Sequence, residues 1–198
     1  MKPLTFTMSE AEKIFFTSDT HFFHKNIIDF CNRPYGDMQT MNSALIMNWN
    51  KVVPKDGIVF HAGDFAMTAN KEYIKELISQ LNGKIYLVFG NHDYQNRLDR
   101  VDVKPLFHQT SDMYQFTVLD DELEGGHINF IITHYPFLFW RRGYIHLFGH
   151  IHSGPNSTSK DKVPYHPMRY DIGVDAWNYT PVSYNIMKNH IKKMSESL

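Results

Sequence analysis

Acidic and histidine side chains directly follow a short apolar run near the start of the chain. In the stretch FFTSDTHFFHKN, residues 15–26, only one threonine separates Asp19 from His21. A carboxylate and an imidazole at this spacing can cap a helix, form a surface ion pair or bind a metal ion. The pair alone favours none of these, so the rest of the sequence has to distinguish between them.

Similar side chains follow four more apolar runs. The motifs are Gly63-Asp64, Gly90-Asn91-His92-Asp93, His134 and Gly149-His150-Ile151-His152. Glycine allows close approach of the backbone to a ligand, and imidazoles at positions i and i+2 project to the same side of an extended segment. Each motif alone is compatible with an ordinary turn. Five of them, each just past an apolar run, indicate a metal site.

The apolar runs themselves are predicted strands. We expect strands at 14–18, 58–62, 85–89, 114–119, 128–133 and 145–148, and helices at 40–52 and 70–82. Residues 120–127, DDELEGGH, are typical of a hairpin connection, and 22–39 and 153–167 of long loops. The alternation of strand and helix favours α/β layers with parallel strands in the first half. In such sheets ligands bind where the strands end.

Length and composition restrict the class of protein. The 198 residues are expected to form a single domain, residues 1–198. A formal net charge of -1 argues against a broad basic surface for nucleic acid. The single cysteine, Cys31, excludes an intramolecular disulfide, and no apolar run has the length of a signal peptide or a membrane span. We therefore expect a cytoplasmic protein without membrane association.

Taken in order, the motifs resemble those of the calcineurin-like metallophosphoesterases. That family's pattern runs D-x-H, G-D, G-N-H-D/E, a lone H and G-H-x-H, and its counterpart here extends from Asp19 to His152. The opening SDTHFFHKNII, with NRP shortly after it, also resembles a small prokaryotic and phage branch of the superfamily. The resemblance implies an α/β fold, a four-layer α-β-β-α sandwich of two mixed sheets flanked by helices.

The resemblance also implies a role for each motif residue. One metal ion would be bound by Asp19, His21, Asp64 and His152, and the other by Asp64, Asn91, His134 and His150. Asp64 would therefore bridge the two ions. His92 would face the substrate as an acid and would not bind metal. For Asp93, a role in orienting His92 or a nearby ligand and a plain surface position remain open alternatives.

This set of side chains suits the hydrolysis of phosphate esters. Two metal ions about 3.5–4 Å apart can clamp phosphoryl oxygens and lower the pKa of a bridging water towards about 7. Histidine, whose unperturbed pKa is about 6.5, can protonate a leaving oxygen. The mixture of imidazole, amide and carboxylate ligands suits Mn²⁺, Fe, Ni²⁺, Co²⁺ or Zn²⁺, and the sequence does not choose among them.

Three further residues are candidates for contacts with an anionic substrate. His24 lies three positions past His21 and either contacts the substrate or has a structural role. Arg33 and Arg141 can clamp a phosphate through their guanidinium groups, and the alternative for each is a solvated side chain. The aromatic residues at 135–140 either pack in the core or form a wall for a nucleobase.

These inferences predict a dinuclear metal-dependent phosphoesterase. We expect it to act on a phosphorylated small molecule or a nucleotide, with a preference for phosphodiesters because His92 supplies the acid that a poor leaving group needs. The alternatives within the superfamily are a phosphomonoesterase and a nuclease, and the near-neutral net charge disfavours nucleic acid. A non-catalytic scaffold on this fold is disfavoured because every ligand position and His92 are intact.

Overall fold

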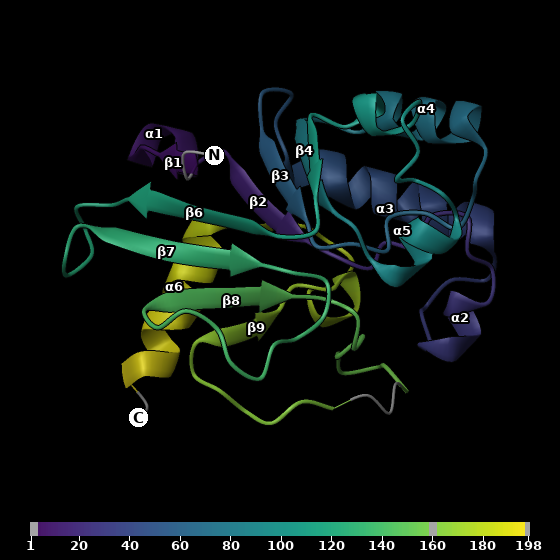
Figure 1. Cartoon of the computed structure of the whole chain (residues 1–198). Coiled ribbons are helices and arrows are strands. Elements are labelled where there is room, and N and C mark those ends of the chain that lie inside the picture. Colours follow the sequence, from purple (N-terminus) through teal and green to yellow (C-terminus); the bar gives the residue numbers. More distant parts are fainter. Residues whose placement is uncertain (1–3, 159–161, 197–198) are drawn as a thin grey trace.

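The chain folds around two five-stranded sheets, which the computed structural model describes for residues 4–158 and 162–196 (Figure 1). Sheet A has the strand order β1-β6-β7-β8-β9, and sheet B the order β10-β2-β3-β4-β5. The strands of sheet A are β1 (Leu4–Phe6), β6 (Tyr114–Leu119), β7 (His127–Ile132), β8 (Tyr144–Phe148) and β9 (Arg169–Asp171). Those of sheet B are β10 (Val182–Ser183), β2 (Ile14–Thr17), β3 (Ile58–His61), β4 (Lys84–Val88) and β5 (Gln109–Ser111).

Both sheets are mixed. In sheet B, β2 to β5 are parallel and only β10 is antiparallel to its neighbour β2. In sheet A, β6 and β7 form an antiparallel hairpin, and the remaining pairs are parallel. The parallel strands β2, β3 and β4 therefore end at one edge of sheet B, as β7 and β8 do in sheet A, and the loops after all five can contribute to one site.

Helices flank the sheets. They are α1 (Met8–Ala11), α2 (Ile27–Phe30), α3 (Met38–Val52), α4 (Lys71–Gln80), α5 (Asn91–Gln95) and α6 (Tyr184–Glu196), with 3-10 turns at Lys104–Leu106 and Val174–Ala176. The amphipathic helices α3 and α4 bury Trp49, Ile74 and Leu77 against one face of sheet B. Asn70 caps α4, because its side chain accepts from the backbone N–H groups of Glu72 and Tyr73.

The second apolar layer lies between the two sheets. Side chains alternate along each strand, so that Phe15 and Val59 face the helices, whereas Phe16 and Phe60 face sheet A. The ring of Phe60 stacks on that of Phe116 from sheet A, with centroids 4.5 Å apart. Helix α6 packs into the same layer, and the structure confirms the predicted α/β sandwich of two mixed sheets flanked by helices.

The predicted long elements agree closely with the structure. The strand predicted at 114–119 has the same limits as β6, the other five predicted strands differ by a residue at their ends, and 120–127 connects the hairpin. The predicted loop at 22–39 also contains the short helix α2. Of the predicted loop at 153–167, residues 159–161 lie outside the described residues, and the described part has neither helix nor strand.

Candidate metal centre and substrate cleft

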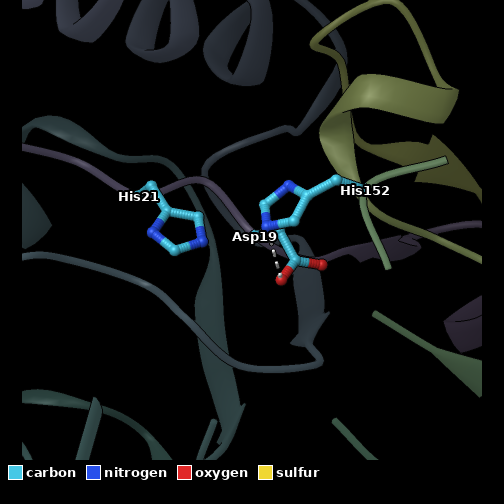
Figure 2. A group of neighbouring side chains, drawn as sticks. All are labelled: Asp19, His21 and His152. Carbon is cyan, nitrogen blue, oxygen red and sulfur yellow. Dashed lines mark ion pairs between the residues drawn. The ribbon is translucent and has the colours of Figure 1, made fainter. Parts of the chain in front are cut away.

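Asp19, His21 and His152 form the first group of potential ligands (Figure 2). Asp19 and His21 belong to the chain that leaves β2, and His152 to the loop after β8. His152 Nε2 lies 3.9 Å from Asp19 Oδ1. The backbone N–H of His150 donates to both oxygens of Asp19, at 3.1 and 2.9 Å, and so holds the two loops together.

Asp64, His134 and His150 form the second group, which Asn91 joins. His134 Nε2 lies 3.5 Å from Asp64 Oδ2 and 3.0 Å from Asn91 Oδ1. Asp64 Oδ2 also lies 3.5 Å from His21 Nε2, which belongs to the first group. Asp64 therefore stands between the two groups, where the resemblance requires a bridging carboxylate. His21, Asp64 and His92 also offer atoms within 4.8 Å of one another.

The hydrogen bonds around His134 define what its Nε2 can do. Nδ1 lies 2.8 Å from the carbonyl oxygen of Ala62, which can only accept, so Nδ1 carries the proton. In the neutral ring Nε2 is then an acceptor, and it faces two further acceptors, Asn91 Oδ1 and Asp64 Oδ2. Tyr135 supplies one proton to Asn91 Oδ1, but none of the three acceptors supplies a proton to the other two, and a shared cation would satisfy all three. Their separations fit donors about 2 Å from a shared ion.

His21 supports the same conclusion for the first group. Its side chain is buried, and Nε2 has no hydrogen-bond partner among the described residues. A buried polar atom without a partner is costly, and here it points at the buried carboxylate of Asp64. Burial raises the pKa of Asp64, so its negative charge is unfavourable there without a cation. The residues present therefore fit a pair of divalent metal ions.

A second contact on each imidazole sets the orientation of these rings. His134 Nδ1 donates to Ala62, His21 Nδ1 lies 3.1 Å from His24 Nδ1, and His152 Nδ1 donates to Asp175 Oδ2 at 2.9 Å. Such outer contacts fix the tautomer of a metal-binding histidine. Burial by itself lowers the pKa of His152, but the carboxylates of Asp19 and Asp175 raise it to about 11. Metal binding at His152 therefore has to displace a proton.

Arg33 lies beneath the site and not in it. This position differs from both alternatives that the sequence left open, a phosphate clamp and a solvated side chain. Its side chain is buried and forms a bidentate ion pair with Asp175, with both N–O distances 2.9 Å. The same guanidinium donates to the carbonyl oxygens of Thr20 and Asp19. All of these contacts occupy the planar fork, so Arg33 is neither solvated nor directed at a substrate. It supports Asp175, which in turn orients His152.

Strained backbone is concentrated at the potential ligands. Asp19, His21, Asp64, His150 and His152 all have positive φ, between 48 and 74°. This left-handed region is uncommon for residues other than glycine and costs of the order of 1–3 kcal/mol. It turns each chain sharply at the end of its strand.

Gly90 and Gly149 allow the close approach of these turns. A Cβ atom at Gly90 would lie 2.2 Å from Asp64 Oδ1, and one at Gly149 would lie 2.3 Å from Asp19 Oδ2. Both distances are far below van der Waals contact. The glycines of these motifs are therefore needed for the carboxylates to occupy their positions.

Asp93 connects the loops that follow β3 and β4. It is buried and accepts from the backbone N–H groups of Asp64, Phe65 and Gly90, at 2.7 to 2.9 Å. Burial raises its pKa to about 7, against the lowering effect of these hydrogen bonds. Asp93 is therefore not a surface carboxylate. It holds the backbone of Asp64, and among the described residues its hydrogen bonds go to backbone N–H groups and not to the ring of His92.

A cleft of about 370 Å³ opens over the two groups. It is lined by His21, His24, Ile27, Phe30, Cys31, Asp64, Met67, Asn91, His92, His150 and His152. His92 is partly exposed in this cleft, with Nε2 4.0 Å from Asp64 Oδ2. Its Nδ1 is buried and has no hydrogen-bond partner within the described part of the chain. Helix α2 and Met67 give the cleft an apolar wall. Arg141 is not among these residues and lies in a different pocket.

Two residues at the site escaped the sequence interpretation. Asp175 follows the last motif by more than twenty positions and carries no spacing signal, although it bonds His152. Tyr135, which was predicted only as part of an aromatic run, donates from its hydroxyl to Asn91 Oδ1 at 3.3 Å. Its position directly after His134 was the one available signal.

Comparison with known proteins agrees with this geometry. The family model for calcineurin-like phosphoesterases matches residues 12–179, and the chain belongs to that family. An uncharacterised protein of Methanocaldococcus jannaschii is 34% identical over 185 residues, 91% of this chain and 92% of that protein. The gene 66 protein of Mycobacterium phage L5 is 30% identical over 183 residues, 82% and 86% of the two chains.

A solved structure shows the same fold. The crystal structure of a protein of unknown function from Aquifex aeolicus superposes with a TM-score of 0.62 at 24% identity, and the match covers 89% of this chain and 98% of that one. Among the described residues of the present chain, no helix has the length and apolar character needed to cross a membrane.

Proposed function

We propose that the protein is a dinuclear metal-dependent phosphodiesterase. The observation that carries the proposal is the convergence of acceptors at the centre of the site, above all His134 Nε2, Asn91 Oδ1 and Asp64 Oδ2. Asp19, His21 and His152 would hold one ion, with Asn91, His134 and His150 holding the other and Asp64 shared by both. Membership of a phosphoesterase family supports phosphate esters as substrates.

The positions of the residues in the cleft suggest the role that each would have in the reaction. When bound, two divalent ions supply positive charge for the phosphoryl oxygens and make water more acidic. Asp64 is held for this role by the backbone N–H of His92, which donates to Oδ1 at 2.9 Å. His92 would give a proton from Nε2 to the leaving oxygen. His24 keeps the ring of His21 in place and lines the cleft beside His92.

The lining of the cleft favours diesters over monoesters. A monoester carries close to two negative charges, and proteins commonly bind such groups with arginine or lysine. Among the described residues that line the cleft there is no arginine or lysine, because Arg33 is paired with Asp175 below it. A diester carries one charge and a second ester group, for which Ile27, Phe30 and Met67 provide an apolar surface.

The test compares hydrolysis of bis-p-nitrophenyl phosphate and p-nitrophenyl phosphate by Mn²⁺-loaded protein. We expect faster turnover of the diester and loss of activity on chelation. His92→Ala should lower kcat by about 10²- to 10⁴-fold while two metal ions per chain stay bound. His127→Ala, which removes an exposed histidine at the start of β7, is the matched control.

Other results would change the assignment in defined ways. Faster hydrolysis of the monoester would make the protein a phosphomonoesterase and leave the metal centre intact. Loss of one metal ion in His92→Ala would make His92 a ligand and remove it as the acid. Absence of both activity and bound metal would favour the non-catalytic scaffold.

A further inference from the structure

A second pocket is separate from the cleft, and most of the residues that line it belong to the chain between the end of β7 and the start of β8. Figure 1 shows the course of this connection. It has a volume of about 270 Å³ and is lined by Leu138, Phe139, Trp140, Arg141, Arg142, Gly143, Tyr144, His166 and Met168. The pocket adjoins Tyr144 at one end of β8, and the metal centre adjoins Gly149 at the other. At about 3.3 Å per residue, roughly 16 Å separate the two.

The pocket is locally basic although the whole chain is close to neutral. Residues 125–160 contain neither Asp nor Glu, whereas the full chain has 21 of them. Arg141 and Arg142 form no ion pair within the part of the chain that the structure describes. The guanidinium of Arg141 lies over the ring of Tyr144, 4.8 Å from its centroid. Two arginine side chains are thus available for an anion.

Trp140 provides a rigid aromatic surface in the same pocket. Its Nε1 donates to the carbonyl oxygen of Tyr144 at 2.8 Å. Its ring packs against His146 and His166, with centroids 5.0 and 4.5 Å away, and Arg169 lies 5.8 Å from its centroid. Arg169 also donates to the carbonyl oxygen of Phe137 at 2.6 Å and so fixes the segment. An aromatic ring held in place in this way can stack with little loss of conformational entropy.

Fixed aromatic rings beside arginines that have no ion-pair partner among the described residues form the usual surface for single-stranded nucleotides. Bases stack on aromatic side chains while basic side chains follow the phosphates. Phe139 is 91% exposed beside the arginines, which would also suit insertion into an anionic membrane. The hollow shape and the fixed ring of Trp140 favour a planar group that enters the pocket.

The pocket and the metal centre share one segment of chain. It starts directly after His134, and Tyr135 contacts Asn91 in the metal centre. A strand that occupies the pocket would therefore have only a few nucleotides to span before a phosphodiester reaches the cleft.

We propose that the pocket formed by Trp140, Arg141, Arg142 and Tyr144 binds single-stranded nucleic acid, at a distance from the phosphodiester that is hydrolysed. The inference rests on the proposed phosphodiesterase function and specifies its substrate class. In this proposal Arg141 binds nucleic acid in the pocket and does not contact the phosphodiester in the cleft.

The test measures binding without hydrolysis. Chelated protein is titrated against a short fluorescein-labelled oligothymidylate, and anisotropy gives Kd at several salt concentrations. We expect Trp140→Ala to weaken binding about tenfold. The double variant Arg141→Ala/Arg142→Ala should reduce the slope of log K against log salt by about 1.4, which corresponds to two lost phosphate contacts. Lys51→Ala/Lys55→Ala removes the same charge from two exposed positions that do not line the pocket, at the end of α3 and just after it, and is the matched control.

A second set of experiments compares the hydrolysis of an oligonucleotide and of a small diester, and tests whether the pocket binds a membrane instead. With Mn²⁺ bound, the ratio of oligonucleotide to bis-p-nitrophenyl phosphate hydrolysis should fall in the pocket variants and stay constant in the lysine control.

Equal losses of affinity in the arginine and lysine variants, or no oligonucleotide binding by the wild type, would overturn the proposal. Loss of binding to phosphatidylserine vesicles, without an effect on the oligonucleotide, would identify a membrane contact instead. If the wild type binds the oligonucleotide but hydrolyses no ester, only the proposed function fails.

Discussion

His152 depends on a residue that the motifs do not contain. Its Nδ1 donates to Asp175, and Asp175 is held by the buried guanidinium of Arg33. The same guanidinium donates to the carbonyl oxygens of Asp19 and Thr20. A single arginine therefore links the chain after β2 to the loop after β8, and both contribute to the first group of ligands.

We expect Asp175→Asn to weaken binding of the ion at Asp19 and His152. The change keeps the shape of the side chain and removes the charge that orients and polarises the imidazole. Outer contacts of this kind contribute about 10- to 100-fold to metal affinity. The pH dependence of binding should also shift to lower pH, because the carboxylate of Asp175 helps to raise the pKa of His152. Titration calorimetry with Mn²⁺ at several pH values measures both effects.

Asp29→Asn is a suitable control, since Asp29 is an exposed carboxylate on the nearby helix α2. A purely structural role for Asp175 would lower the melting temperature and leave the pH dependence of metal binding unchanged. That result would contradict the interpretation.

At the scale of elements, a buried polar cluster joins the β6–β7 hairpin to helix α6. The carboxylate of Asp120 accepts from the hydroxyl of Tyr184 at 2.6 Å and from Lys188 Nζ at 2.8 Å. Lys188 also pairs with Glu122 at 2.9 Å. The connection therefore fixes the last helix against the turn of the hairpin, far from the metal centre.

Asp120→Ala should lower the free energy of unfolding by about 3 kcal/mol, because it leaves Lys188 without its buried partner. Burial opposes ionisation of Asp120, but its hydrogen bonds to Lys188 and Tyr184 prevail and lower the pKa. The stabilisation is therefore complete above the unfolded value of about 3.9 and is lost as the pH falls through the lower folded value. Denaturant unfolding measures the free energy of unfolding of the wild type and of Asp120→Ala. The difference between the two proteins should be large at neutral pH and smaller below about pH 4.

The neighbouring variant Asp121→Ala, at an exposed position, should change stability little at any pH. An Asp120→Ala penalty that did not depend on pH would indicate lost packing and not a lost ion pair.

At the scale of the whole molecule, the candidate metal centre lies where the two sheets meet. Asp19, His21, Asp64 and Asn91 follow strands of sheet B, whereas His134, His150 and His152 follow strands of sheet A. Ions bound between these loops would connect the layers at the end of the sandwich. They would also offset the repulsion between the buried carboxylates of Asp19 and Asp64.

Chelation should therefore lower the melting temperature. A ligand at one hundred times its Kd stabilises the folded state by about 2.7 kcal/mol, and in a chain of this size each kcal/mol changes the melting temperature by about 2–4 °C. Calorimetry with Mn²⁺ and with EDTA should differ by about 5–10 °C. In Asp64→Ala, which removes the shared carboxylate, this difference should nearly disappear. An equal difference in both proteins would place the stabilising ions elsewhere.

The sequence by itself determined the long elements and pointed to the side chains that the fold gathers as candidate ligands. Periodic apolar residues predicted the six strands that bury a full face and the helices α3 and α4, because periodicity reflects which face is buried. The strands β1, β5, β9 and β10 have only two or three residues and were not predicted. Such short segments show no detectable alternation, and their pairing with neighbouring strands defines them.

Only the tertiary structure decided the roles of the remaining polar residues. The pairing of Arg33 with Asp175 connects positions 142 apart in the chain, and Asp93 bonds the backbone of a loop 29 residues away. The separation of Arg141 from the cleft likewise follows from the path of the segment between β7 and β8. The motifs of candidate ligands were visible in the sequence because each of these turns is local, whereas the supporting contacts form only when distant loops meet at the end of the sandwich.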